Sequence, residues 1–173
     1  MAHLKEAISA KDHTRGSKES QVQIVEYGDF QCSYCGQAEP IVEKLLNDFG
    51  SALSVTFRNF PLSDMHPMAF GAAAAAEAAG LQGKYWEMHD LIYDNQSSLS
   101  NEMLLEAAKE LGLNIPQFTQ DTESEGIRKK IEHDFETGAT SGVNGTPTFF
   151  INGERFNGGA PDLYQLIAEN ASN

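Results

Sequence analysis

Two cysteines stand three positions apart in the segment Cys32-Ser33-Tyr34-Cys35, and the 173-residue sequence has no others. A thiol must lose its proton to act as a nucleophile, and a free cysteine has a pKa of about 8.5. A helical apolar pattern begins directly after Cys32. This residue is therefore predicted to lie at a helix N-terminus, where unpaired N–H groups stabilise a thiolate. Cys35 follows about one turn later, within reach of a disulfide. The spacing predicts an exposed attacking sulfur and a shielded resolving sulfur.

Glu26 is the third residue whose position indicates chemistry. It lies six residues before Cys32, inside the run Val22–Tyr27, which is otherwise typical of a buried strand. Burial disfavours an ionised carboxylate, so the pKa of Glu26 is predicted to be raised. Such a group can exchange the proton that Cys35 gains or loses as a disulfide opens and closes. The alternative is a glutamate on a solvated face of the strand.

The elements that must position these residues follow a β-α-β, helical, β-β-α order. Strand patterns occur at 22–27, 53–60, 146–151 and 154–156, with a helix at 33–49 and another after Pro161. The fold class is therefore α/β. Its predicted divisions are a polar N-terminal extension at 1–20, a β-α-β half at 21–62, a helical insertion at 63–142 and a β-β-α half at 143–173.

Composition excludes several classes of protein. The chain has 12 Lys+Arg against 25 Asp+Glu, a formal net charge of −13, which repels phosphates and argues against nucleic-acid binding. Two cysteines cannot form a disulfide-stapled secreted scaffold or a four-cysteine zinc site. A zinc site of Cys32, Cys35, His66 and His89 is a further alternative, which the strand-to-helix context of the cysteines disfavours.

Two separate motifs resemble the DsbA-like branch of the thioredoxin superfamily. They are Val25-Glu26-Tyr27-Gly28-Asp29-Phe30-Gln31-Cys32-Ser33-Tyr34-Cys35-Gly36 and Gly145-Thr146-Pro147-Thr148-Phe149-Phe150-Ile151-Asn152-Gly153. The resemblance covers roughly residues 12–170 and is strongest to DsbA-like domains fused to sodium/proton antiporters. It implies a thioredoxin fold with a helical insertion between its two halves. It also implies a redox-active Cys32–Cys35 disulfide that needs no metal or organic cofactor.

The resemblance further implies protein thiols and disulfides as substrates. Cys32 would attack, Cys35 resolve and Glu26 relay the proton. The Thr146–Pro147 bond would be cis and would face the cysteines, and its loop would hold an extended substrate chain. Tyr34 would line the substrate groove or shield Cys35. The redox partner would be a quinone-linked membrane oxidase, a thioredoxin-type reductase or glutathione, and the protein is expected to be a monomer.

Two departures from the family pattern bear on the direction of electron flow. Strong DsbA-type oxidants often carry Pro-His between the cysteines, whereas Ser33-Tyr34 supplies no positive charge. Cys32 is therefore expected to be less acidic and its disulfide less oxidising. The N-terminus has no apolar leader, which favours the cytoplasm. The alternative is a periplasmic or other extracytoplasmic protein whose leader has been removed.

Other functions remain open beside thiol–disulfide oxidoreductase. The main alternative is a redox-sensing or regulatory module that docks on a partner such as a transporter and turns over little. A disulfide isomerase would ordinarily carry an additional dimerisation domain. The glutathione-dependent transferases and isomerases of this fold do not depend on a resolving cysteine.

Overall fold

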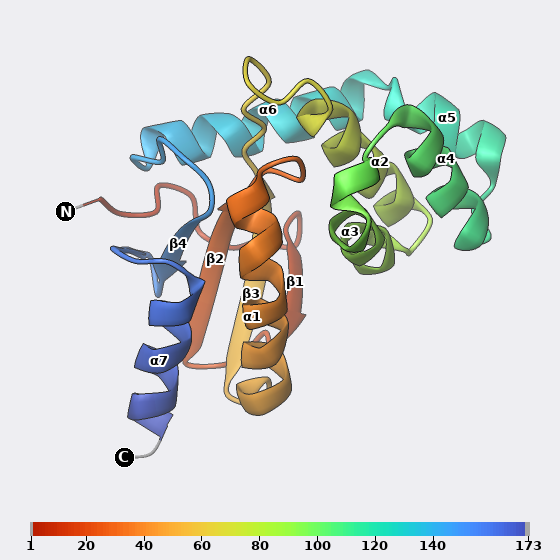
Figure 1. Ribbon diagram of the computed structural model, residues 1–173. Coiled ribbons are helices and arrows are strands. Elements are labelled where there is room, and N and C mark those ends of the chain that lie inside the picture. The colour runs from red at the N-terminus through yellow and green to blue at the C-terminus, as the bar shows by residue number, and fades with distance from the viewer. Residues whose placement is uncertain (1, 172–173) are drawn as a thin grey trace. The chain divides into compact units, whose positions relative to one another are not determined.

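The computed structural model describes residues 2–171, and these form one sheet with seven α-helices and a short 3-10 turn (Figure 1). The strands are β1 His13–Gly16, β2 Val22–Gly28, β3 Leu53–Asn59, β4 Thr148–Ile151 and β5 Glu154–Phe156. The helices are α1 Ser33–Phe49, α2 Ala69–Leu81, α3 Tyr85–Asp94, α4 Asn101–Glu110, α5 Ile115–Thr122, α6 Glu125–Thr140 and α7 Ala160–Ala171, and the 3-10 turn is η1 Gln96–Ser98. The predicted α/β class, with helices between a β-α-β and a β-β-α half, is confirmed.

The sheet contains one strand that the sequence analysis missed. Its order is β1-β3-β2-β4-β5, and β1 pairs antiparallel with β3, Arg15 lying opposite Val55. The sequence predicts only a polar N-terminal extension at 1–20, which includes this segment. Its four residues, His-Thr-Arg-Gly, lack the apolar alternation of a strand because β1 is an edge strand whose residues are only partly buried.

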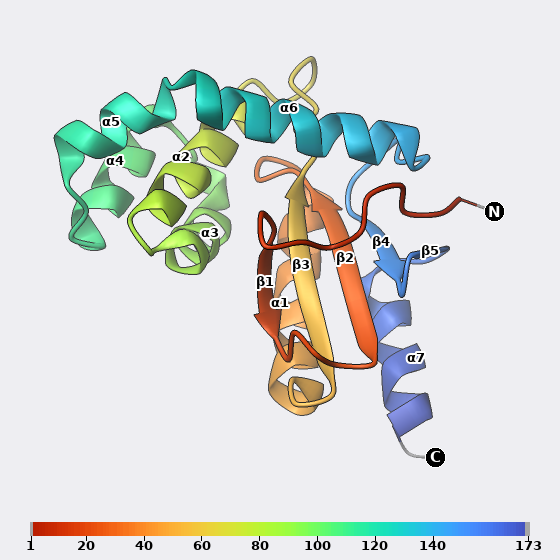
Figure 2. The same ribbon diagram turned by 180° about the vertical axis from the view of Figure 1, so that it is seen from behind.

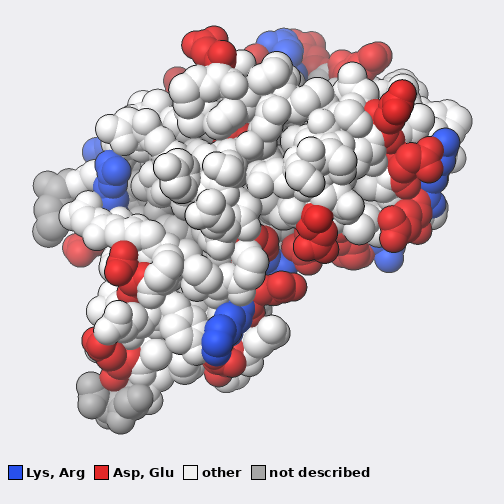
Figure 3. All heavy atoms as spheres, viewed as in Figure 1, with Lys and Arg blue, Asp and Glu red and all other residues white. Residues whose placement is uncertain are grey.

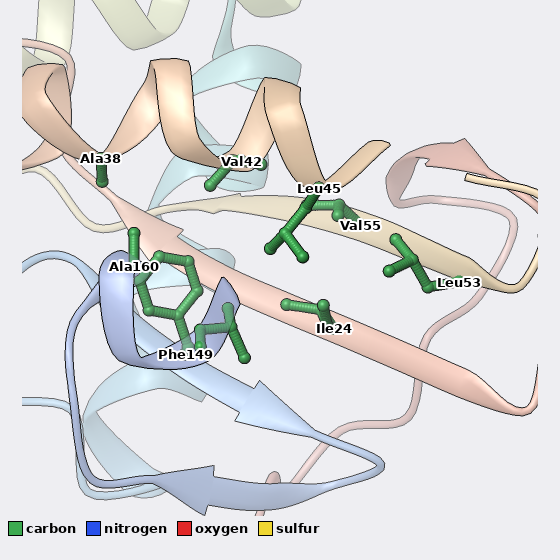
Figure 4. Packing of buried hydrophobic residues seen from close by; sticks show 9 residues of the cluster. Ile24, Ala38, Val42, Leu45, Leu53, Val55, Phe149 and Ala160 are labelled. Atoms are coloured by element: carbon green, nitrogen blue, oxygen red, sulfur yellow. The ribbon is translucent and has the colours of Figure 1, made fainter. Parts of the chain in front are cut away.

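One face of the sheet is covered by α1 and α7 (Figure 1). Figure 4 shows the side chains of α1 pointing toward the strands. The cluster is aliphatic apart from one aromatic ring, and it consists of Ile24, Ala38, Val42, Leu45, Leu53, Val55, Phe149, Ala160 and Leu163. Burial of these apolar side chains fixes α1 against the sheet, and α1 in turn carries the cysteine segment at its N-terminus.

Arg58 holds the N-terminal segment over the opposite face, where Figure 2 shows this segment crossing in front of β2 and β3. Its side chain is 2% exposed. Its Nε and Nη2 donate to the carboxylate of Asp12 at 2.9 and 3.0 Å. The other donors reach the carbonyls of Glu6 and Ala7 and the hydroxyl of Tyr27. Burial opposes the charge, but the bonds to Asp12 and Tyr27 outweigh it and raise the pKa of Arg58.

Helix α1 contains a proline that interrupts its hydrogen-bond ladder. The helix runs from Ser33 to Phe49 with Pro40 inside it. Proline has no backbone N–H, so the carbonyl of Gly36 receives no bond from position 40. The first turn, which carries the cysteines, is therefore joined to the later turns by one hydrogen bond fewer than in an unbroken helix.

The chain divides into two compact units. The first contains the sheet. It consists of the chain up to Gly28, the segment Gln37–Arg58 and the chain from Glu136 onwards. The second consists of Asp29–Gly36 and Asn59–Phe135. The cysteine segment thus belongs to the helical unit by its contacts, although it follows a strand of the sheet in sequence.

Helix α2 is the centre of the helical unit and packs against α3, α4 and α5. Eight alanines of α2 are buried, including the run Ala72–Ala76, as expected for a helix enclosed on all sides. Acidic side chains gather over α4 and α5, at the right of Figure 3, and Glu102, Glu106 and Glu110 of α4 are exposed. Among the described residues, no helix has the length and apolar character needed to cross a membrane.

Candidate active site

Cys32 occupies the N-cap position of α1, as predicted. Helix α1 begins at Ser33, and the carbonyl of Cys32 accepts the first helical bond from the N–H of Gly36 at 3.1 Å. An N-cap side chain is the one that the free N–H groups of the next turn can reach. These groups, with the positive end of the helix dipole, favour a thiolate at Cys32.

The two cysteines differ in accessibility less than predicted. Cys32 is 5% exposed and Cys35 is 0% exposed, and neither is in a disulfide in this structure. The predicted exposed attacking sulfur is thus wrong in degree. The preceding Phe30 packs its ring on Tyr93 and His89, with centroids 5.1 and 5.5 Å apart, and draws the segment into the helical unit.

Asp29 fixes the turn that leads to Cys32. Its buried carboxylate accepts the N–H groups of Gln31 at 2.8 Å and Leu62 at 2.9 Å, and it is hydrogen-bonded to His66 Nδ1 at 2.8 Å. Its backbone carbonyl accepts the N–H of Cys32 at 3.1 Å. The residue therefore shapes the backbone in front of the cysteine.

Gln96 of η1 is a site residue that the sequence analysis missed. Its Nε2 donates to the carbonyls of Phe30 and Cys32, both at 2.8 Å. The two carbonyls flank Gln31, so one side-chain amide bridges the turn that presents the cysteine. No local pattern identifies this residue, because Gln96 follows Cys32 by 64 positions and lies in a short polar segment.

Glu26 is buried in the sheet unit, which rules out the solvated alternative. It is 1% exposed, lies opposite Phe149 of β4, and its Oε1 has no hydrogen-bond partner. Burial raises the pKa of Glu26 well above its ordinary value, and repulsion from Glu39 raises it further. The charge of Arg15 partly offsets this by lowering the pKa of Glu26. The Nη2 of Arg15 also binds Glu39 Oε1 at 2.6 Å.

The three residues predicted to contact substrate lie in two different segments. Tyr34 is 69% exposed, an unusual exposure for an aromatic side chain beside two buried cysteines. Thr146 and Pro147 are half-buried, and the bond between them is cis. Thr148 begins β4 and donates its hydroxyl to the carbonyl of Gly145 at 2.7 Å, which closes the loop.

Both histidines of the zinc alternative are hydrogen-bonded to carboxylates. His66 is bonded to Asp29, as described above. His89 is 1% exposed, its Nδ1 lies 2.9 Å from Asp90 Oδ1, and its ring packs on Trp86 with centroids 4.9 Å apart. These contacts give each ring a structural role within the helical unit.

Comparisons with known proteins agree with the sequence resemblance. A family model described as thioredoxin matches residues 9–167. The chain is 47% identical over 148 residues to Na(+)/H(+) antiporter NhaA 1 of Salinispora arenicola, covering 86% of this chain and 22% of the antiporter. It therefore spans about a fifth of the length of the curated relatives it matches.

Two solved structures have the same fold. A thioredoxin-like oxidoreductase from Silicibacter pomeroyi superposes with a TM-score of 0.79 at 25% identity, covering 95% of each chain. The thiol-disulfide exchange protein alpha-DsbA2 from Wolbachia pipientis superposes with a TM-score of 0.81 at 24% identity, covering 93% of this chain and 86% of the other.

Proposed function

Because the chain belongs to the thioredoxin family, we propose that it exchanges disulfides with protein substrates through Cys32 and Cys35. The observation that carries the proposal is the position of Cys32 as N-cap of α1, with Cys35 fully buried one turn later. A thiolate stabilised there is both a nucleophile and a good leaving group. The redox equivalents reside in the cysteine pair, so the reaction needs no metal or organic cofactor.

The reaction consists of two sulfur–sulfur exchanges. A substrate thiolate attacks Cys32 Sγ of the oxidised pair, forming a mixed disulfide and releasing Cys35 as a thiolate that takes up a proton. A second substrate thiolate then attacks the substrate sulfur of the mixed disulfide, and Cys32 leaves as a thiolate. The substrate loses two electrons and the pair gains two. Substrate reduction follows the same steps in reverse, and Cys35 then resolves the mixed disulfide.

Three further roles belong to the proposal. Glu26 gives or takes the proton of Cys35, which its raised pKa supports. Tyr34 contacts the substrate from its exposed position. Thr146 and Pro147 hold the substrate as an added strand, a mode of recognition that depends on backbone hydrogen bonds. A quinone-linked oxidase, a thioredoxin-type reductase or glutathione restores the pair.

The reduction potential of the Cys32–Cys35 pair tests the proposal. Equilibration in glutathione buffers, with alkylation and mass spectrometry, should show one intramolecular disulfide that forms and breaks reversibly. A potential near about −120 mV indicates a disulfide donor in an extracytoplasmic compartment, and one near about −270 mV a reductase in the cytoplasm. Failure to form the disulfide at any glutathione ratio would contradict the proposal.

A second candidate function is favoured by the names of the curated relatives. The matching segment of the Salinispora arenicola relative belongs to a protein called an antiporter. A redox-sensing module coupled to a transporter would form the same disulfide but would not catalyse exchange on unrelated substrates. Reduction of a disulfide-bonded protein such as insulin, measured against a thiol-only background, separates the two candidates.

Replacing Glu26 by leucine is expected to stabilise the protein at neutral pH while slowing exchange. The pKa of Glu26 is raised in the folded protein and returns to 4.5 in the unfolded chain. Between these two values only the folded protein keeps the proton. The free energy of unfolding therefore falls as pH rises, by about 1.4 kcal/mol per pH unit. Leucine removes this loss, so urea unfolding at pH 7 should show a stabilisation that is absent at pH 4.

Glu26→Gln is the matched variant for kinetics because it keeps the shape of the side chain. It should slow exchange between pH 6 and pH 9, because the amide cannot give or take the proton of Cys35. An unchanged pH–rate profile would remove the relay. Equal effects of leucine on stability at pH 4 and pH 7 would show that the carboxylate is not penalised by burial.

A further inference from the structure

The first turn of α1 has one hydrogen bond fewer to the rest of its helix, and Gln96 of η1 adds two hydrogen bonds beside it. Pro40 removes the bond that would reach the carbonyl of Gly36. In place of that support, Gln96 Nε2 bonds the carbonyls of Phe30 and Cys32 from the side. The carbonyl of Cys32 therefore accepts two hydrogen bonds, one from the helix and one from Gln96.

Gly36 provides the space for this amide. A Cβ built on Gly36 would lie 2.2 Å from Gln96 Oε1 and 3.0 Å from its Cδ. Both atoms belong to the far end of a flexible side chain, so a methyl group at position 36 would displace the amide rather than the helix. The absence of a side chain at Gly36 thus allows the Gln96 amide to reach the turn.

We propose that Gln96 is a positioning residue, which holds the turn before α1 in the geometry that stabilises the Cys32 thiolate. The inference rests on the proposed function and adds to it a residue outside the Cys32–Cys35 segment. An N-cap side chain meets the N–H groups of the next turn only while the N-cap backbone keeps its conformation. By bonding the carbonyls on both sides of Gln31, the amide fixes that conformation.

The expected direction of the effect follows from this geometry. A loosened turn stabilises the thiolate less, so the fraction of reactive Cys32 at pH 7 falls. The disulfide then becomes less oxidising, because stabilisation of the reduced form is what makes such a disulfide a strong oxidant. Of the titratable side chains, Asp29, His66 and Tyr93 hydrogen-bond within this segment or to it, and the proposed substitutions leave all three in place.

Two substitutions, one at each residue, should break the hydrogen bonds from Gln96 to the carbonyls of Phe30 and Cys32. Gln96→Met removes both donors with little change in side-chain length. Gly36→Ala displaces the amide, although alanine is a better helix former than glycine. Each should slow alkylation of Cys32 by iodoacetamide at pH 7 by about twofold to tenfold, the range that one hydrogen bond accounts for. The equilibrium with glutathione should shift toward the disulfide by a similar factor.

The double variant decides whether the two residues act together. Because either change already removes the contact, Gln96→Met with Gly36→Ala should have no larger effect than the larger single change. Gln117→Met is the control, since it makes the same substitution at an exposed glutamine of α5, whose side-chain amide donates to Asp121 Oδ1 at 2.8 Å. It should change neither measurement.

Several results would overturn the inference. One is a Gln96→Met variant that is less stable in urea but keeps the wild-type alkylation rate and reduction potential. Another is a double variant in which the effects of the two substitutions simply add. Failure of the proposed function itself gives a different result. In that case the wild-type protein forms no Cys32–Cys35 disulfide in glutathione buffers. If only the Gln96 role fails, the wild-type protein still exchanges disulfides, and the variants have the wild-type alkylation rate and potential.

Discussion

A Cys35→Ser variant is expected to remain covalently attached to its substrates. Once Cys32 has formed a mixed disulfide, the release of a reduced substrate requires attack by the neighbouring sulfur, and serine cannot supply it. Exchange should therefore stop at the mixed disulfide. Non-reducing electrophoresis and mass spectrometry should detect an adduct that dithiothreitol removes and that maps to Cys32.

Cys32→Ser provides the opposite result in the same assay. It should form no adduct and show no exchange, because Cys35 is fully buried and lies inside the first turn of α1 rather than at its N-cap. Cys35→Ala repeats the trapping experiment without a buried hydroxyl. Adducts on Cys35 in the Cys32→Ser variant, with none on Cys32 in the Cys35→Ser variant, would reverse the two roles.

Arg58→Met is expected to lower the free energy of unfolding by about 3–5 kcal/mol, the cost of leaving a buried charge without its partner. The partner is Asp12, whose side chain is 7% exposed and binds Arg58 through both carboxylate oxygens. The substitution also removes the hydrogen bonds that the guanidinium donates to the carbonyls of Glu6 and Ala7. Urea unfolding, followed by circular dichroism, measures the loss.

Two comparisons isolate the buried charge. Arg128→Met removes an ion pair with Glu132 on the exposed face of α6, and it should change stability by less than about 1 kcal/mol. The double variant Arg58→Met with Asp12→Leu removes both charges and should recover part of the stability. If the double variant is less stable than Arg58→Met alone, Asp12 is not the residue that makes the single change costly.

The sequence predicts the fold where apolar patterns are strong. The runs that became β2 and β3 are β-branched and aromatic, and these patterns predicted both strands. Edge strand β1 was missed because its side chains are polar and only partly buried. The strands and helices that the sequence predicts are therefore those with a strong local apolar pattern.

The candidate site divides in the same way. Cys32, Cys35 and Glu26 are candidates from the sequence because their residue types are unusual for their positions. Gln96 is an ordinary glutamine in a polar segment, and only the folded chain brings its amide to Cys32. Arg15 and Glu39, which set the charge around Glu26, belong to β1 and to the middle of α1, and no local motif connects them.

Pro40 also affects how the protein fluctuates. Proteins open locally in small cooperative segments, at a free-energy cost below that of global unfolding. The turn before Pro40 has lost a ladder bond to the rest of α1, whereas Val42 and Leu45 after it are packed in the core. Amide hydrogens of the cysteine turn can therefore exchange with solvent while those of the later turns stay protected. Opening of this turn would expose Cys35, which has no accessible surface in the structure, while Val42 and Leu45 stay packed.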